Sequence, residues 1–248
     1  MAAGQGFRGL EKAAGLVKVS LYSREAVQLM GYPGGKSRVF RVAAGLRECG
    51  VDGFVSAGNV SIDGFKVVGK GHSSIVVLGS HDGRGVVAVK VRRIDSKHPS
   101  LRREAVLQEE ASRAGVAPRV YCFSDDFIVM DYIDGVHLGD AVLSDSNVSR
   151  VLEAAYILDV AGVNHKELSR PWRHVLLLDS RAVIIDYGSA GWGGCRNLPR
   201  IASALSRRIG LTVDEPLRML LREYRRGCSR RLYREIYRVF LSAFHGTV

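Results

Sequence analysis

The stretch from His165 to Gly188 decides the fold of this chain, and it reads HKELSRPWRHVLLLDSRAVIIDYG. Two short apolar runs, at 175–178 and 182–185, are joined by a polar turn, which predicts a β-hairpin. Glu167 lies in the loop before the first strand, and Asp186 follows the second strand directly. A hairpin is a rigid way to set two carboxylates near each other, so that one can accept a proton while the other holds Mg²⁺.

The composition is that of a globular protein with an unusual charge. The 248 residues suit one large domain or two small ones, and 46% hydrophobic and 25% charged residues are ordinary values. The net charge of +11 favours acidic partners such as a nucleotide, nucleic acid or ribosome. No apolar run reaches transmembrane length, and residues 1–9 lack the apolar stretch of a signal peptide, so we expect no membrane association.

The four cysteines are scattered along the chain without a C-x-x-C pair: Cys49, Cys122, Cys195 and Cys228. This pattern predicts neither a metal site nor a disulfide framework. It is typical of a protein in a reducing, cytoplasmic compartment.

The first 54 residues are expected to form a helical extension. Apolar spacing predicts one helix from Leu10 to Val17, a second capped by Ser23 and ending near Met30, and a third from Ser37 to Cys49. Three short helices are also typical of a winged-helix-like module that binds nucleic acid. We favour a helical extension that packs on the following domain.

A glycine-rich turn follows several short strands. Residues 69–76 read GKGHSSIV, which fits the pattern G-x-G-x-x-G-x-V with Ser74 in place of the third glycine. A glycine hairpin lets backbone N–H groups approach phosphate oxygens without side-chain obstruction. Because a strand and not a helix follows, the pattern does not fit a Rossmann site, and it lacks the G-K-[ST] ending of a Walker A loop.

The next strand ends in a lysine that has candidate partners. Alternating residues predict a strand containing the run VAVK, which ends in Lys90, and a helix follows from about Leu101 to Ser112. The first turns of this helix hold Glu104, the best ion-pair partner for Lys90, and Glu109 and Glu110 are the alternatives.

A second predicted hairpin, at 120–123 and 127–130, leads into an acidic, glycine-broken segment from Asp131 to Gly135. Two helices are then expected, at 138–143 and 148–161, and the His165 stretch follows them.

From Leu198 to Phe244 the pattern is helical and basic. This segment contains eleven arginines and four acids, a net charge of +7, so most of the charge of the chain lies here. A solvated helix face would explain it. The alternative is an RNA or ribosome contact that uses the interleaved Tyr224, Tyr233 and Tyr237, although tyrosines at such spacing more often pack against a core.

In this order the motifs resemble those of protein kinases. The glycine loop, the V-A-I-K-like strand, the helix with Glu104 and the hinge precede a loop similar to H-R-D-L-x-x-x-x-N, and Asp186-Tyr187-Gly188 is similar to D-F-G. Glu167 stands where these kinases have their catalytic Asp, and no Asn lies at the usual offset. The resemblance covers about residues 60 to 190 well and the rest poorly.

More narrowly, the chain resembles the small archaeal predicted serine/threonine kinases related to the RIO kinases, and the small archaeal kinase of the KEOPS tRNA-modification complex. This likeness is carried by ELSRPWRH at 167–174, VKVRR at 89–93 and REA at 103–105.

The resemblance implies an α+β, bilobal protein kinase-like fold with a cleft between its lobes. The helical extension would span 1–54 and the kinase-like domain 55–248, with a β-rich N-lobe at about 55–130 and a helical C-lobe at about 135–248. The implied activity is that of a serine/threonine protein kinase, a transferase that moves the γ-phosphoryl group of ATP to a protein hydroxyl with Mg²⁺ or Mn²⁺, by autophosphorylation as one option.

By that resemblance Lys90 would hold the α/β-phosphates, Glu104 would orient Lys90, Glu167 would accept the hydroxyl proton and Asp186 would bind the metal. The nucleotide would contact the glycine loop, the following strands and the hinge: Gly69, Lys70, Gly71, Ser73, Ser74, Val76, Ala88, Lys90, Glu104, Met130, Asp131, Tyr132, Ile133 and His174.

Several alternatives stay open. His174 has three candidate roles: it would replace the metal-binding Asn, touch a phosphate, or form a hydrogen bond with Glu167. Arg170 and Arg173 would contact an acidic substrate. Because of Glu167 and the missing Asn, an ATPase or a nucleotide-binding pseudokinase switch is the second hypothesis. An RNA- or ribosome-associated binding protein is the third, and it rests on charge alone.

Overall fold

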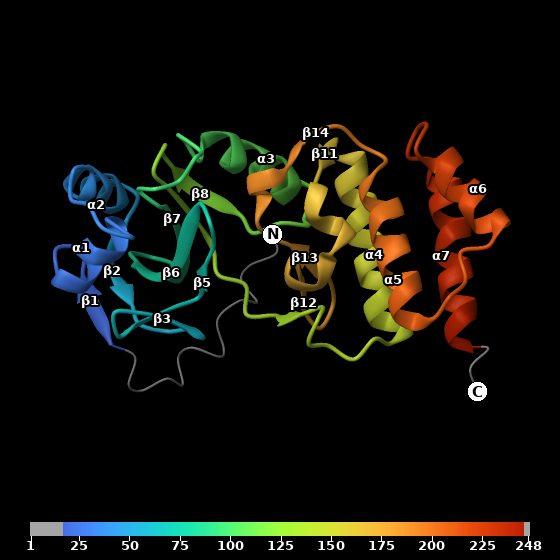
Figure 1. Cartoon of the computed structure of the whole chain (residues 1–248), viewed down its shortest axis with the longest axis horizontal. Coiled ribbons are helices and arrows are strands. Elements are labelled where there is room, and N and C mark those ends of the chain that lie inside the picture. The colour runs from blue at the N-terminus through green and yellow to red at the C-terminus, as the bar shows by residue number, and fades with distance from the viewer. Residues whose placement is uncertain (1–16, 246–248) are drawn as a thin grey trace. The chain divides into compact units, whose positions relative to one another are not determined.

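A computed structural model describes residues 17–245 of the chain (Figure 1). The chain forms two compact units: unit 1 consists of Met1–Ala105 and Arg119–Asp134, and unit 2 consists of Val106–Pro118 and Gly135–Val248. Both units combine helices with antiparallel sheets, so the predicted α+β class is confirmed.

A seven-stranded antiparallel sheet forms the centre of unit 1. Six of its strands lie in the order β1-β2-β6-β7-β9-β8, and the seventh, β5, pairs with β6 outside this order. Separate from this sheet, β3 and β4 form a two-stranded hairpin. The strands are β1 (Lys18–Ser20), β2 (Val51–Val55), β3 (Val60–Ile62), β4 (Phe65–Val67), β5 (Gly69–Lys70), β6 (Ser74–His81), β7 (Gly85–Arg92), β8 (Val120–Phe123) and β9 (Phe127–Asp131).

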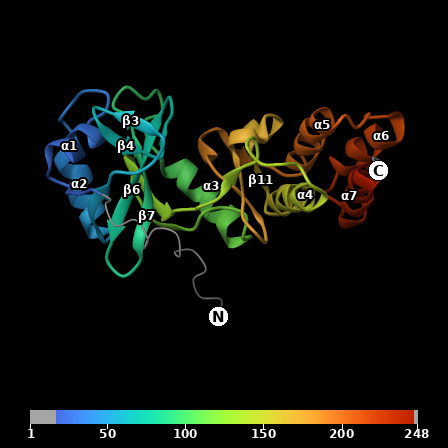
Figure 2. The same cartoon turned by 90° about the horizontal axis from the view of Figure 1, so that it is seen from below.

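The alternation along β7 assigns its two faces. Val87, Val89 and Val91 belong to the buried cluster that also includes residues of α1 (Arg24–Met30) and α2 (Val39–Glu48). Figure 2 shows these two helices side by side against the sheet. Successive side chains of a strand point to opposite faces, so Lys90 points away from α1 and α2.

The predicted helical extension is not a separate domain. Its second and third helices are confirmed as α1 and α2, and Ser23 caps α1 by accepting a hydrogen bond from the Ala26 N–H at 3.2 Å. However, β1 and β2 flank α1 and α2 in sequence and are strands of the main sheet, so the predicted boundary after residue 54 falls inside β2. The helix predicted from Leu10 onward falls on residues outside the described part of the chain.

A buried carboxylate ties α2 to the sheet. Asp126 accepts hydrogen bonds from Arg38 at 2.9 Å, from Arg41 at 2.7 Å and from Arg92 at 2.7 Å. Burial alone would raise the pKa of Asp126, but the hydrogen bonds from Arg92 and Arg41 and the charge of Arg38 outweigh it and hold the pKa below its usual value.

Unit 2 surrounds the hairpin that the sequence predicts at 175–185. The strands β12 (Val175–Leu177) and β13 (Ala182–Ile184) pair with each other, and β10 (Val136–His137) pairs with β12. The helices are α4 (Asp145–Val160), α5 (Asn197–Ile209), α6 (Glu215–Tyr224) and α7 (Arg230–His245), and α4 packs against both α5 and α7. No helix within residues 17–245 is both long and apolar enough to cross a lipid bilayer.

The helix predicted at 138–143 is wrong. The N–H of Leu138 donates to Val175 and that of Gly139 donates to Trp172, each at 2.9 Å, so the segment is held by the strand and loop beside it. These non-local bonds fix the backbone at the start of the segment in a turn after β10, which a local apolar pattern does not reveal.

The tyrosines of the basic C-terminal segment are packed into unit 2. Tyr224 is fully buried, and the Tyr233 ring stacks on Tyr156 with centroids 4.2 Å apart. The Tyr237 hydroxyl is 3.0 Å from the Ser149 Oγ in a hydrogen bond. These contacts confirm the expectation that tyrosines at such spacing serve the core.

Two disulfides contradict the prediction from cysteine spacing. Cys49 pairs with Cys122 in unit 1, and Cys195 pairs with Cys228 in unit 2. The partners are 73 and 33 residues apart, so only the tertiary fold brings them together. The inference of a reducing compartment, which rested on the absence of disulfides, loses its basis.

Candidate functional site

The candidate site of unit 2 is built around the β12–β13 hairpin. Two short 3₁₀ turns, η2 (Lys166–Ser169) and η3 (Pro171–Arg173), lead from β11 (Val163–Asn164) into β12. In the hairpin register Val175 lies opposite Ile184, and the next residue, Ile185, donates its N–H to the His174 carbonyl at 2.9 Å. The residues just before β12 and just after β13 therefore lie side by side.

Glu167, His174 and Asp186 form a compact cluster at this point. One ligand atom of each residue lies within 4.8 Å of those of the other two. His174 Nε2 is 3.1 Å from Glu167 Oε2, and the two side chains are 20% and 44% exposed. The cluster offers two carboxylates and one imidazole nitrogen to solvent, which is a donor set for a divalent cation.

His165 fixes the backbone that carries Asp186. Its buried Nε2 lies 2.8 Å from the Asp186 carbonyl and 3.2 Å from the Ile185 carbonyl. A carbonyl oxygen can only accept, so Nε2 carries the proton. Burial, together with the charge that His174 would carry, lowers the pKa of His165 to about 4, so the imidazole is neutral near pH 7.

Asp186 has a left-handed backbone conformation, with φ 67° and ψ 75°. Residues other than glycine adopt this region rarely, and Asp is among those that tolerate it best. Such strained positions gather at functional sites because the surrounding structure has to hold them. Here the surrounding structure is the β-hairpin on one side and His165 on the other.

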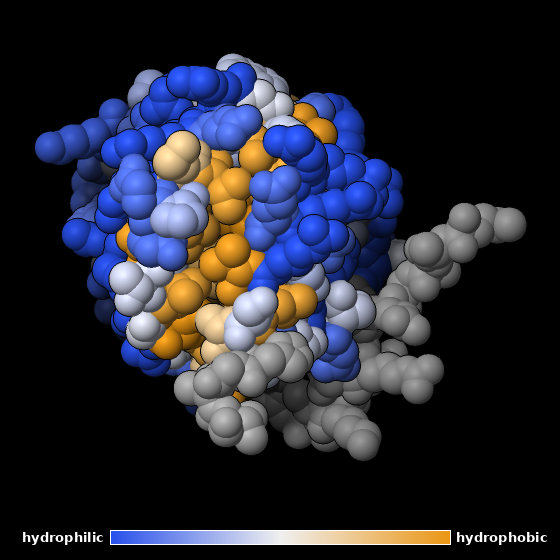
Figure 3. Space-filling model, turned by 90° about the vertical axis from the view of Figure 1, so that its right-hand side faces the viewer, coloured by the Kyte–Doolittle hydropathy of each residue, from blue (hydrophilic) through white to orange (hydrophobic). Residues whose placement is uncertain are grey.

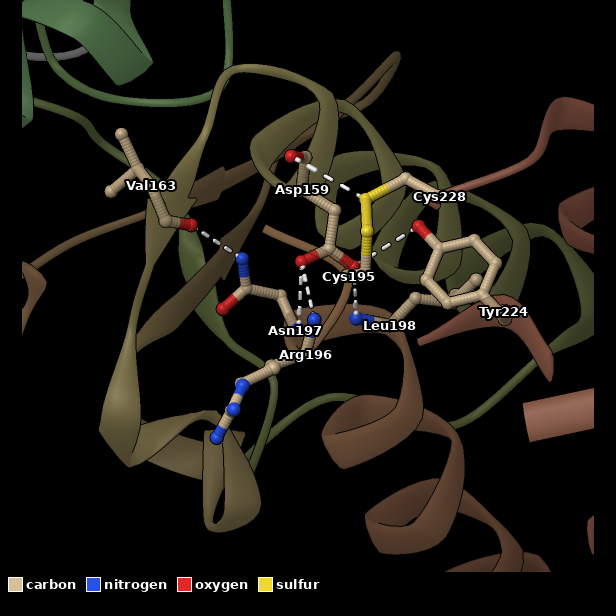
Figure 4. Close-up of a disulfide and its surroundings, with 8 residues drawn as sticks. All are labelled: Asp159, Val163, Cys195, Arg196, Asn197, Leu198, Tyr224 and Cys228. Atoms are coloured by element: carbon tan, nitrogen blue, oxygen red, sulfur yellow. Dashed lines mark hydrogen bonds between the residues drawn. A yellow bond between two sulfur atoms is a disulfide. The ribbon is translucent and has the colours of Figure 1, made fainter. Parts of the chain in front are cut away.

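Asn197, the first residue of α5, holds the start of the loop that contains His165, and Figure 4 shows its bond to Val163. Its side chain accepts from the His165 N–H at 2.9 Å and donates to the Val163 carbonyl at 2.6 Å. Asn197 is completely buried, so these bonds replace contacts that water would otherwise make.

Asp159 of α4 in turn caps the start of α5 (Figure 4). Its carboxylate accepts from three backbone N–H groups, each at 2.9 Å, and from the Tyr224 hydroxyl at 3.0 Å. The three N–H groups belong to Arg196, Asn197 and Leu198. Burial raises the pKa of Asp159, while the bonds it accepts oppose that shift. The disulfide Cys195–Cys228 lies directly beside this cap.

Sequence reasoning missed Asn197 and Asp159, although Asp159 carries a usable signal. It lies four residues after Ala155 and seven after Leu152, so it occupies the apolar stripe of α4. A charged residue in an apolar stripe needs a buried partner. Asn197 has no comparable signal, because its role depends on a loop 32 residues earlier in the chain.

Unit 1 contains a buried lysine with the predicted partner. Lys90 on β7 and Glu104 on α3 (Arg102–Arg113) form an ion pair and are only 4% and 6% exposed. The alternative acid Glu110 instead pairs with Arg113. Along the sheet, Lys90 lies opposite Val76 of β6.

The glycine loop is a hairpin, as predicted. The Gly71 N–H donates to the Ser74 carbonyl, and the Arg93 N–H donates to the Ser73 carbonyl, each at 2.8 Å. A Cβ added at Gly69 would meet nothing within 4 Å, and one at Gly71 would meet only the Ser74 carbonyl, at 3.4 Å. Packing within the protein therefore does not require glycine at these two positions. The space beside their Cα atoms is open, so a ligand can approach the backbone closely.

The predicted hinge begins at the end of β9. Ala88 of β7 lies opposite Met130. The Asp131 N–H already donates a hydrogen bond to the Arg119 carbonyl at 2.9 Å. Outside the strand pairings, the backbone groups of Tyr132 and Ile133 make no hydrogen bond to other backbone groups of residues 17–245.

The predicted site residues thus fall into two groups. The glycine loop, Lys90, Glu104 and the hinge belong to unit 1, while Glu167, His174 and Asp186 belong to unit 2. Within each group the structure brings the expected partners together.

Three more predictions concern the loop of unit 2. Arg170 and Arg173 are exposed. His174 contacts Glu167, which is one of the three roles considered for it.

No protein-family model matches the chain, and no curated protein matches its sequence.

Proposed function

We propose that the chain is an ATP- and divalent-metal-dependent protein kinase with a bilobal, kinase-like fold. Unit 1 would supply the glycine loop, Lys90 and the hinge for the nucleotide, and unit 2 would supply Glu167 and Asp186 for phosphoryl transfer to a serine or threonine hydroxyl. The order of the motifs in the sequence supports this assignment.

The observation that carries the proposal is the buried Lys90–Glu104 pair beside the glycine hairpin. Burying two charges costs so much desolvation that apolar residues of similar size usually stabilise a fold as well or better. The pair therefore needs another reason, and a lysine held in a fixed place for phosphate oxygens provides one.

In unit 2 the position of each residue suggests its role in phosphoryl transfer. Glu167 is partly exposed and would accept the hydroxyl proton of the substrate, and His174, 3.1 Å away, would orient its carboxylate. His165 would keep the Asp186 backbone in place, and Asn197 would keep the His165 loop in place. Exposed Arg170 and Arg173 would face an acidic substrate.

The donor set fits a divalent cation, with Asp186 as the main ligand and His174 and Glu167 within reach. When bound, the cation would neutralise charge on the phosphates during transfer. An imidazole next to two carboxylates suits Mn²⁺ better than Mg²⁺, because Mg²⁺ strongly prefers oxygen ligands.

The test measures nucleotide binding by calorimetry and loss of the ATP γ-phosphate, with and without a protein substrate. Asp186→Ala and the paired change Lys90→Met/Glu104→Met should each weaken binding or abolish turnover. The paired change is used because Lys90→Ala alone would leave the buried Glu104 carboxylate without the Lys90 ammonium. Lys66→Ala and Asp179→Ala replace exposed residues of the same types and should behave as the unchanged protein.

The outcomes separate the hypotheses. Transfer to a protein hydroxyl that needs both sets of residues supports the kinase, and γ-phosphate loss without transfer identifies an ATPase. Binding without turnover identifies a pseudokinase. Unchanged binding and turnover in both altered proteins would refute the assignment.

A further inference from the structure

The helices α6 and α7 leave apolar surface uncovered. Their fully buried stripes pack into unit 2, but the neighbouring Leu220 and Val239 are only half-buried, and Met219 is 60% exposed. Leu220 lies three residues after Leu217 of the buried stripe, and Val239 lies three after Ile236. Figure 3 shows an apolar band between hydrophilic surfaces on this side of the molecule. We call the three apolar side chains Met219, Leu220 and Val239 the α6–α7 strip.

The charge around the α6–α7 strip is strongly positive. Residues 215–243 contain eight arginines and three glutamates. Each of two glutamates is paired, Glu215 with Arg218 and Arg222, and Glu235 with Arg231. Exposed Arg234 and Arg238, one turn apart on α7, have no ion-pair partner among the described residues. A partner that covers the strip would gain most if it carried acidic groups at its edges.

The apolar residues indicate a protein rather than RNA. Bases are held mainly by stacking on exposed aromatic rings. The tyrosines of these helices are already packed against the core, and the accessible apolar groups among their described side chains include the aliphatic Met219, Leu220, Val239 and Leu241. A second copy of the chain is disfavoured, because a two-fold contact through the strip would place like-charged arginines opposite one another.

We propose that the α6–α7 strip binds an acidic amphipathic helix of a partner protein. Such a helix would lay leucine-like side chains along the strip and set its glutamates or aspartates beside Arg234 and Arg238. Met219 suits this role because its unbranched thioether side chain adapts to the shape of a partner. The proposal does not depend on phosphoryl transfer.

The probe is a fluorescent helical peptide of about 18 residues, five turns, with leucines on one face and glutamates elsewhere. A second peptide has the same composition in scrambled order, so that its leucines share no face. A third probe is single-stranded oligouridine. Binding to the full chain is followed by anisotropy at moderate salt, where weak charge attraction is screened.

The amphipathic peptide should bind at least about tenfold tighter than the scrambled one, as expected when a few anchors carry the affinity. Met219→Ser and Arg234→Glu should each weaken it about tenfold. Val142→Ser, at a side chain 84% exposed outside the strip, and Arg24→Glu, at an exposed arginine of α1, should leave binding unchanged. Circular dichroism confirms that each altered protein is folded.

Three results would overturn the proposal. Equal binding of both peptides would reduce the strip to a non-specific basic surface. Oligouridine binding that Met219→Ser weakens would make it a nucleic-acid site. Self-association that Met219→Ser abolishes would make it an interface between copies of the chain.

Discussion

The Lys90–Glu104 pair allows a quantitative test of how unit 1 is held together. Both side chains are buried, at 4% and 6% exposure, so neither charge can turn to water when the other is removed. Lys90→Met should therefore destabilise unit 1 by about 3–5 kcal/mol, the usual cost of removing one partner of a buried ion pair. The double change Lys90→Met/Glu104→Met removes both charges and should cost at least about 2 kcal/mol less than Lys90→Met alone.

The two tryptophans make the measurement specific. Trp172 and Trp192 both lie in unit 2, so tryptophan fluorescence during urea unfolding follows unit 2, while far-UV circular dichroism follows both units. The unit 1 transition should move to lower urea in the single variant and return most of the way in the double one. Lys66→Met, at an exposed lysine of β4, should move nothing. Energies that simply add in the double variant would refute the coupling.

Three further predictions concern unit 2. Glu167→Gln should abolish phosphoryl transfer and leave ATP affinity unchanged, and full activity of this variant would refute the role of Glu167. Glu167→Asp should slow transfer by up to about a hundredfold, because the shorter side chain moves the carboxylate away from the substrate hydroxyl. The pKa of His165 is about 4 in the folded protein and 6.5 in an unfolded chain, so the unfolded chain binds the proton better. The free energy of unfolding should therefore fall by up to about 3 kcal/mol as the pH drops from 6.5 to 4 in metal-free buffer. His165→Gln should flatten that slope in fluorescence-detected unfolding, and an unchanged slope would assign it to other groups. His174→Asn should lower the affinity for Mn²⁺ relative to Mg²⁺ in calorimetry, and an unchanged ratio would exclude the imidazole as a ligand.

Local patterns predicted the elements that carry most of the candidate site. The alternating run at 86–91 is β7, the turn at 179–181 joins β12 to β13, and Ser23 caps α1, because each of these features is decided by neighbouring residues. The partner of Lys90 was also predicted, since the next helix in the chain carries Glu104 in its first turn. The failed prediction of a helix at 138–143 marks the limit, because backbone bonds from β12 and η3 decide that segment.

What the tertiary structure alone decided is the set of contacts between residues far apart in the chain. The disulfides join residues 73 and 33 positions apart, Asn197 holds a loop 32 positions earlier, and Asp126 accepts hydrogen bonds from arginines of α2 and β7. The sequence by itself determined most of the strands and helices that carry the candidate site residues. It did not determine these long-range partners, because a buried polar group is satisfied by whatever the fold places beside it, and no local pattern records that.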